Sequence, residues 1–240
     1  MRDRTERRPP RARPWVTVHF AQSLDGRIAT KAGDSRWISG QETTRFAHAL
    51  RAAADAVLVG SGTALADDPL LTVRHVPGKQ PLRVLLDTRG RVPPAAQLFR
   101  DTTTRTLHVT RQVLGAELPS HVERCALPVS PSGEGVHLDA LLVALAERGA
   151  RELLVEGGRG VITSFLREGL VDRLVVTVAP LVIGEGIEAV GDLGTRKLDQ
   201  ALRLELRRVL HVGGDVLLEL AREGAPPLPI ALPDPAKVTS

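Results

Sequence analysis

Short, mostly apolar runs recur along the chain, and their spacing constrains the fold more than any other feature. They lie at residues 16–21, 56–60, 82–87, 106–110, 122–127, 152–156 and 174–179. Runs this rich in Val and Leu, with apolar residues on both faces, are typical of strands buried on both sides. Segments with helical periodicity separate several of them, and such alternation predicts a largely parallel sheet covered by helices.

The first of these helices carries a recognisable start signal. Ser39, with Glu42 three residues on, has the pattern of a capping box and predicts a helix that runs to about Ala54. Apolar residues at helical spacing predict which face of this helix is buried. They are Phe46, Leu50, Ala53 and Ala54.

The rest of the chain completes the predicted architecture. Residues 138–148 and 160–168 are predicted helices, and residues 22–38 form a turn-rich connection. The last two predicted strands, 202–209 and 215–221, have no helix between them, which favours an antiparallel pair. The sequence therefore predicts a three-layer α/β fold, with a mostly parallel central sheet, flanking helices and an antiparallel C-terminal hairpin.

Composition excludes several classes of protein. Hydrophobic residues make up 42% of the 240 residues, but aromatic residues only 2%, so the core must be aliphatic. No apolar run approaches the roughly 18 residues of a membrane span. Cys125 is the only cysteine, which rules out an internal disulfide and favours a reducing cytoplasm.

The net charge of +4 is confined to the N-terminus. Residues 1–14 hold six arginines and two acidic residues, so the rest of the chain balances 26 basic against 26 acidic side chains. A neutral body argues against extensive nucleic-acid contacts. We expect a disordered Arg/Pro-rich arm at 1–14, one domain at 15–222 and a loose Pro/Ala-rich tail at 223–240.

Motifs for metal and hydrolase chemistry are incomplete. His121 and Glu123 match the H-x-E of zinc deaminases, but the P-C-x-x-C partner is missing. The histidines show no other metal-binding spacing, and there is no G-x-S-x-G. We expect no metal site.

Two glycine-rich segments follow predicted strands. GSGT, from Gly60 to Thr63, and VEGGRG, from Val155 to Gly160, match neither the Walker nor the dinucleotide fingerprint. Glycines before a helix allow close approach of an anion, but a tight turn with positive φ explains VEGGRG equally well. Thr63 suits either a phosphate contact or a turn cap.

Two aspartates, Asp67 and Asp68, and an arginine, Arg74, follow the first glycine segment. An Asx turn before Pro69 accounts for one aspartate, and the other suits a neutral donor or proton delivery. Arg74 has the planar fork that binds phosphate, although a lone arginine is more often a solvated surface charge.

Several motifs, taken in order, resemble one family. They are SLDG at 23–26, GDSRW at 33–37, ADDPLLTVR at 66–74 and VEGGRG at 155–160. In this respect the chain is similar, from about Trp15 to Leu220, to the reductase domain of bacterial riboflavin biosynthesis, which has the dihydrofolate reductase fold. The resemblance implies NADPH-dependent reduction of 5-amino-6-(5-phosphoribosylamino)uracil, by hydride transfer to ribose C1′.

The resemblance also implies roles for individual residues. Asp67 is expected beside the reacting centre, and Asp67 and His19 are the expected catalytic residues. The resemblance implies that Ser35, Arg51 and Arg74 form a clamp for the substrate phosphate. Leu71 and Glu156 are implied as further substrate contacts. Positions implied on the cofactor side are Ala21, Trp37, Thr63, Asp67, Thr88, and the pyrophosphate cradle of Gly158, Arg159, Gly160, Val161, Ile162, Thr163 and Ser164.

The chain departs from the family pattern at His19, where many relatives carry Lys, and at Gln22, where a small residue is usual. We expect His19 to preserve a donor role, alter the substrate or weaken activity. The alternative is a reductase of the same fold acting on another pyrimidine or pterin-like compound. The resemblance further implies a homodimer and, without the often-fused deaminase domain, deamination by a separate protein.

Overall fold

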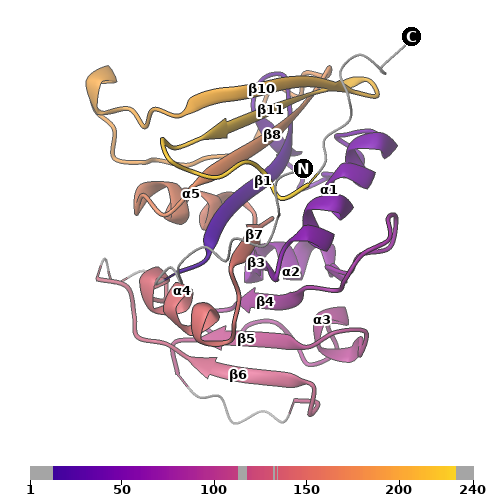
Figure 1. The fold of residues 1–240 in the computed structure, drawn as a ribbon, viewed down its shortest axis with the longest axis vertical. Coiled ribbons are helices and arrows are strands. Elements are labelled where there is room, and N and C mark those ends of the chain that lie inside the picture. Colours follow the sequence, from indigo (N-terminus) through magenta and orange to yellow (C-terminus); the bar gives the residue numbers. More distant parts are fainter. Residues whose placement is uncertain (1–12, 113–117, 132, 134, 231–240) are drawn as a thin grey trace, which may run out of the picture.

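The computed structural model describes residues 13–112, 118–131, 133 and 135–230. In these residues the fold is a nine-stranded sheet with helices on both faces (Figure 1). Its strands, in sheet order, are β10 (Glu205–Val212), β11 (Asp215–Ala221), β8 (Arg173–Ala179), β1 (Trp15–Ser23), β7 (Glu152–Val155), β3 (Ala56–Gly60), β4 (Leu82–Leu86), β5 (Thr106–Thr110) and β6 (Val122–Ala126).

Strand directions confirm the predicted architecture. Every neighbouring pair from β8 to β6 is parallel, whereas β11 runs antiparallel to β8, and β10 to β11. The two last strands are joined by a tight turn at Gly213, which has a φ of 61°. The carboxyl ends of the parallel strands therefore meet at one edge of the sheet.

Alternate side chains of each strand enter two separate cores. Ala56 and Leu58 of β3 pack with α4 (Leu138–Glu147) and α5 (Arg159–Arg167). Val57 and Val59 pack instead with the helices on the other face, α1 (Gln41–Ala53), α2 (Ser61–Asp67) and α3 (Gln97–Arg100). Because both faces are covered, both sets of strand residues must be apolar.

The predicted capping box is wrong. Helix α1 begins at Gln41 after Gly40, and no side chain of the local sequence caps it. Asp215 of β11 does so from across the fold, because its Oδ2 accepts from the Gly40 N–H at 2.8 Å and from the Thr43 hydroxyl at 2.7 Å. Of the predicted buried face, Ala53 is only half-buried.

Several short elements and the bounds of β10 also differ from the predictions. Within the connection predicted at 22–38, β2 (Arg27–Thr30) pairs antiparallel with β9 (Gly186–Glu188). Helix α2 occupies residues 61–67, where we predicted no helix, and β10 begins and ends three residues later than predicted. Segments of three to seven residues contain too few periodic positions to reveal themselves.

The described ends of the expected arm and tail pack on the domain. Arg13 donates two hydrogen bonds to Asp172, at 2.7 and 3.0 Å. Ala225 and Leu228 are buried, and the Pro227 carbonyl accepts from Arg173 at 3.0 Å. A loose tail is therefore wrong for residues 225–228. Residues 1–12 and 231–240 lie outside the described part.

Among the described helices, none has the length and apolar character needed to cross a membrane.

Candidate active site

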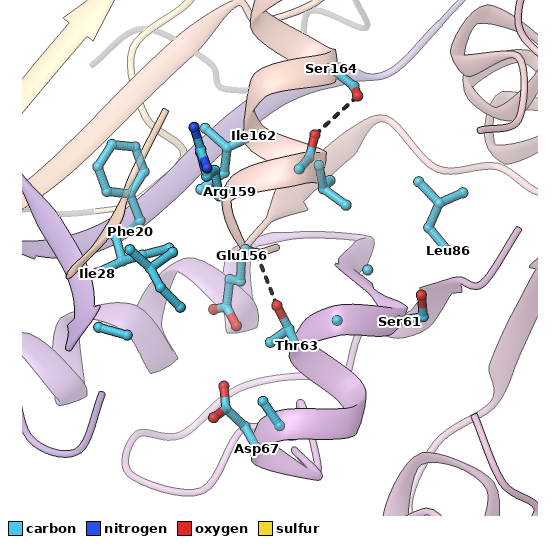
Figure 2. A pocket seen from close by; sticks show the side chains of 18 of the residues that line it. Phe20, Ile28, Ser61, Thr63, Asp67, Leu86, Glu156, Arg159, Ile162 and Ser164 are labelled. Atoms are coloured by element: carbon cyan, nitrogen blue, oxygen red, sulfur yellow. Dashed lines mark hydrogen bonds between the residues drawn. The ribbon is translucent and has the colours of Figure 1, made fainter. Parts of the chain in front are cut away.

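A cavity of about 780 Å³ lies at the carboxyl ends of the parallel strands. Residues at the ends of four neighbouring strands line it, in the sheet order β1, β7, β3 and β4, with β7 represented by Glu156 directly after it. Figure 2 shows Phe20 and Ile28 on one side and Leu86 and Ser61 on the other. We call these sides the β1–β7 half and the β3–β4 half. This edge is where open α/β sheets bind their ligands.

The two glycine-rich segments meet in the middle of the cavity (Figure 2). The Thr63 hydroxyl accepts from the Gly158 N–H at 3.0 Å. A Cβ at Gly60 would lie 2.6 Å from Val161 Cγ2, and one at Gly157 would lie 2.9 Å from Val161 Cβ. No glycine of VEGGRG has a positive φ, so a positive-φ turn is the wrong explanation. Gly60 and Gly157 are needed because the two turns pack tightly.

The first turn of α5 offers unpaired donors to the cavity. Its N-cap, Gly158, has no side-chain cap, and the first helical bond is from the Ile162 N–H to the Gly158 carbonyl. A Cβ added at Gly62 or Gly160 would meet no atom within 4 Å, although both residues line the cavity. The site therefore keeps open space beside a helix N-terminus, which suits an anion.

A charged pair lies in the β1–β7 half. Arg51 of α1 binds Glu156, which follows β7, through Nε to Oε1 and Nη2 to Oε2, both at 2.8 Å. Burial favours the neutral carboxyl, but Arg51 outweighs it and lowers the pKa of Glu156. Burial likewise opposes the charge of Arg51, but Glu156 raises its pKa. Both groups are therefore ionised at neutral pH.

His19 of β1 lies in the same half and is buried. Burial lowers its pKa to about 4, against the opposing effect of Glu156. Its Nε2 is 3.4 Å from Thr177 Oγ1. The imidazole is neutral at pH 7, so it can exchange hydrogen bonds but cannot supply the permanent positive charge of a lysine.

Asp67, the last residue of α2, lines the cavity. Burial raises the pKa of its carboxyl, and Arg36 offsets only part of that effect. Asp68, by contrast, ends α2 in the left-handed conformation and accepts from the Gln97 N–H at 2.7 Å. The first aspartate faces the cavity, and the second holds a connection to α3 in place of the expected Asx turn.

The cavity brings together most of the predicted site residues: His19, Ala21, Ser35, Arg51, Thr63, Asp67, Thr88, Glu156, Gly158, Arg159, Gly160, Val161, Ile162 and Ser164. Four others lie outside its lining. Trp37 lines a smaller neighbouring cavity of about 300 Å³. Leu71 and Thr163 are buried, and the Thr163 hydroxyl bonds the Arg159 carbonyl and the Gly191 N–H.

Arg74 is the fourth, and it lies close to Arg51, since both side chains contact Thr72. Its Nη1 donates to the Thr72 hydroxyl at 2.6 Å, while Arg51 Nη1 donates to the Thr72 carbonyl at 3.3 Å. His48 holds the Arg74 backbone, since its Nδ1 accepts from the Arg74 N–H at 3.0 Å. Two guanidinium groups thus converge on Thr72.

Sequence reasoning missed three polar residues around the β3–β4 half. Ser61 and Arg91 line the cavity, and Asp87 supports the turn that carries Arg91. The segment DTRGR, directly after a predicted strand, contained the signal: an aspartate, a glycine and an arginine at turn spacing.

Comparison with curated proteins gives close relatives. The chain is 39% identical over 211 residues to riboflavin biosynthesis protein RibD of Aquifex aeolicus, covering 88% of this chain and 58% of that protein. It is 37% identical over 217 residues to the 2,5-diamino-6-ribosylamino-4(3H)-pyrimidinone 5′-phosphate reductase of Methanothermobacter thermautotrophicus, covering 88% of this chain and all of that one. The chain thus spans little more than half of the bacterial protein.

Solved structures and a family model agree with this result. The Thermotoga maritima deaminase/reductase is 31% identical, with a TM-score of 0.75 over 88% of this chain and 57% of the other. Enterococcus faecalis dihydrofolate reductase, 13% identical with a TM-score of 0.50 over 87% and 96%, shows the shared fold alone. The model of the RibD C-terminal domain matches residues 14–218. The chain therefore belongs to the RibD C-terminal domain family.

Proposed function

We propose that this protein reduces a ribosylaminopyrimidine 5′-phosphate to its ribitylamino form, with NADPH as the reductant, in riboflavin biosynthesis. The observation that carries this proposal is the cavity itself. It places a carboxylate–guanidinium pair, a second carboxyl with a raised pKa and an open helix N-terminus around one space. Relatives named for this reductase support it.

The donors in the middle of the cavity fit a dinucleotide. We assign the pyrophosphate to the first turn of α5, because its N–H groups are unpaired and Gly62 and Gly160 leave room. Residues 158–164 form this cradle, with Thr63 and Thr88 on the same side as the cofactor. The nicotinamide supplies the hydride that reaches ribose C1′.

The β1–β7 half fits the substrate. A carboxylate can accept about four hydrogen bonds. Glu156 accepts three from Arg51, so one lone pair is left to accept from a pyrimidine N–H. We assign the substrate phosphate to Ser35, Arg51 and Arg74. Arg74 has to turn away from Thr72 to reach it.

We assign proton delivery to Asp67. Reduction of the ring-opened imine adds hydride to C1′ and a proton to nitrogen, so a nearby acid is required. Burial raises the pKa of Asp67, and no described group donates a hydrogen bond to its carboxylate. This keeps its proton available for transfer. His19, being neutral, orients the substrate through hydrogen bonds.

The test is NADPH oxidation with two substrates, the aminouracil and the diaminopyrimidinone 5′-phosphates, using wild type, Asp67→Asn and Arg74→Ala. We expect Asp67→Asn mainly to lower kcat and Arg74→Ala mainly to raise KM. Equal, small effects would refute this division of roles. No turnover of either substrate, despite NADPH binding, would reject the riboflavin assignment.

One feature favours a second candidate, a reductase of the same fold acting on another pyrimidine or pterin-like compound. His19 is neutral where many relatives have a cationic lysine, and Arg74 lies outside the cavity lining. Both reduce the positive charge presented to a phosphate. Turnover of an unphosphorylated pyrimidine or pterin, faster than that of the phosphates, would establish this alternative.

We also infer a cytoplasmic homodimer. Strand β10 lies at the edge of the sheet in the described residues, and Leu206 and Val209 on it are exposed. Light scattering of the purified protein tests the dimer. A monomer at micromolar concentration would contradict it.

A further inference from the structure

His48 of α1 is a buried titratable residue that the proposed reaction does not use. It is 3% exposed, and its ring meets that of His75 edge-on, with the ring centroids 4.4 Å apart and the planes at 78°. Its Nδ1 accepts from the Arg74 N–H at 3.0 Å. His48 therefore bonds the main chain of a residue that we assign to the substrate phosphate.

The segment that carries Arg74 has no regular secondary structure to hold it. Residues 68–81 connect α2 to β4 and form neither helix nor strand. The Gln80 amide accepts from the Val73 N–H at 2.8 Å and donates to the Val73 carbonyl at 2.9 Å. His48 bonds the next residue along the chain. Two side chains, rather than a helix or a strand, thus fix the main chain at Arg74.

The side chain of Arg74 is held differently from its main chain. It is exposed, and its Nη1 donates to a neutral acceptor, the Thr72 hydroxyl, at 2.6 Å. In the proposed function this guanidinium turns away from Thr72 to reach the phosphate. Because the main chain is fixed, the motion is a rotation about side-chain bonds. The position of the fixed base matters, since a misplacement of about 1 Å can cost up to about 100-fold in rate.

A neutral imidazole suits this place. Burial lowers the pKa of His48 to about 4, and the neighbouring Arg51, Arg74 and His75 act in the same direction. Glu156 opposes them with a smaller effect. At pH 7 Nδ1 therefore keeps its lone pair for the Arg74 N–H, and Nε2 carries the proton. A lysine here would add a cation and offer no acceptor.

Resting on the proposed function, we propose that His48 is a positioning residue for recognition of the substrate phosphate and that it acts through the main chain of Arg74. His48 is not among the described residues that line the cavity, so its effect reaches the ligand through Arg74. Loss of its acceptor should weaken the binding of a phosphate monoester and leave the unphosphorylated sugar unaffected.

The experiment is calorimetric titration with ribose 5-phosphate, and with ribose as the ligand that lacks the phosphate. His48→Asn and His48→Leu form a matched pair, because the two replacements have the same shape and only Asn offers an oxygen one bond from Cγ, where Nδ1 was. We expect His48→Asn to bind ribose 5-phosphate within about twofold of wild type. His48→Leu should weaken it about 3- to 10-fold, as the loss of one hydrogen bond does.

Two further variants control for folding. His108→Asn replaces a buried histidine of β5 whose Nε2 lies 3.3 Å from Asp87, and it should leave ribose 5-phosphate binding unchanged. If His48→Leu does not fold, His48→Gln takes its place with the same expected loss, because its amide lies one bond further from Cα than that of Asn.

A double-mutant cycle with Arg74→Ala separates positioning from a merely structural role. Arg74→Ala alone should weaken ribose 5-phosphate binding about 10- to 100-fold. Adding His48→Leu should cause no further loss, because no guanidinium is left to place. In steady-state assays His48→Leu should raise KM for the phosphorylated pyrimidine and leave kcat intact. Losses that multiply, or that fall equally on ribose, overturn the inference.

The outcomes distinguish this inference from the function on which it rests. Equal binding of ribose 5-phosphate by His48→Asn and His48→Leu overturns the inference, as does a wild type that binds ribose 5-phosphate no better than ribose. If wild type still oxidises NADPH with the pyrimidine phosphate, the proposed reductase stands. Failure of that oxidation rejects the proposed function, and the titrations still decide the role of His48.

Discussion

The two halves of the cavity hold their charges in opposite ways. In the β1–β7 half, Arg51 and Glu156 are 16% and 10% exposed and bind each other, and His19 is buried and neutral. In the β3–β4 half, Arg91 is exposed, and its guanidinium bonds a neutral hydroxyl, that of Ser61. A buried ion has to be matched by the protein itself, whereas a solvated ion does not.

This difference separates stability from ligand binding. A change in the β1–β7 half leaves a charge buried without a partner, and therefore affects folding as well as catalysis. A change at Arg91 removes a group that water already solvates, and should affect ligand binding alone. Four measurements test this contrast.

The largest effect is expected from Glu156→Gln. It leaves the Arg51 guanidinium buried without its counter-ion, and the free energy of unfolding should fall by about 3–5 kcal/mol. Glu188→Gln is the matched control. Glu188 is 49% exposed and pairs with Arg159 and Arg27, and such solvent-exposed pairs contribute about 1 kcal/mol or less each. Urea denaturation measures both. Equal losses would show that burial of the pair does not matter.

The next effect is acid sensitivity due to His19. The unfolded imidazole takes up a proton below about pH 6.5, but the folded one only near pH 4. The stability that neutral His19 contributes is therefore complete above pH 6.5 and is lost as the pH falls towards 4. Over that window, wild type should lose up to about 3 kcal/mol more than His19→Gln. His211→Gln, an exposed control, should follow wild type; if His19→Gln follows it too, this account of His19 is wrong.

A smaller loss is expected at the junction of the two halves. In Gly60→Ala the new methyl would lie 2.6 Å from Val161 Cγ2, and overpacking of this kind costs about 1–3 kcal/mol. Gly62→Ala should leave stability intact, because its methyl enters open space, but should weaken dinucleotide binding. Thermal unfolding and calorimetric titration measure the two effects. The opposite pattern would mean that the two turns pack differently.

The smallest effect is expected from Arg91→Ala, which should change the free energy of unfolding by less than about 0.5 kcal/mol. Denaturant curves of the Arg91→Ala and Glu156→Gln proteins, measured side by side, provide the check. A loss at Arg91 as large as that at Glu156 would remove the distinction between the halves.

Much of the fold could be predicted because its signals are local. The apolar runs of the long strands, such as residues 56–60, carry a period that requires burial on both faces. The predicted helix start at Ser39 was wrong because a carboxylate 172 residues from Thr43 in the chain replaces the local cap. No pattern around Ser39 contains that information.

Part of the candidate site could likewise be predicted from the sequence, and part could not. The order of the motifs is a property of the sequence. It indicated the family, and most of the site residues that it predicted line the cavity. Arg91 was missed because DTRGR indicates a turn but does not show which of its two arginines lines the cavity. Its relevance comes from the contact with Ser61, 30 residues earlier.

The sequence alone determined the parallel sheet and the two glycine-rich turns, because periodicity and glycine content act within a few residues. Only the tertiary structure decided the charge states. Arg51 and Glu156 meet across 105 residues of chain, and His19 loses its positive charge through burial. Desolvation and ion pairing depend on which groups the fold packs together, and that is a property of the folded chain rather than of any segment in it.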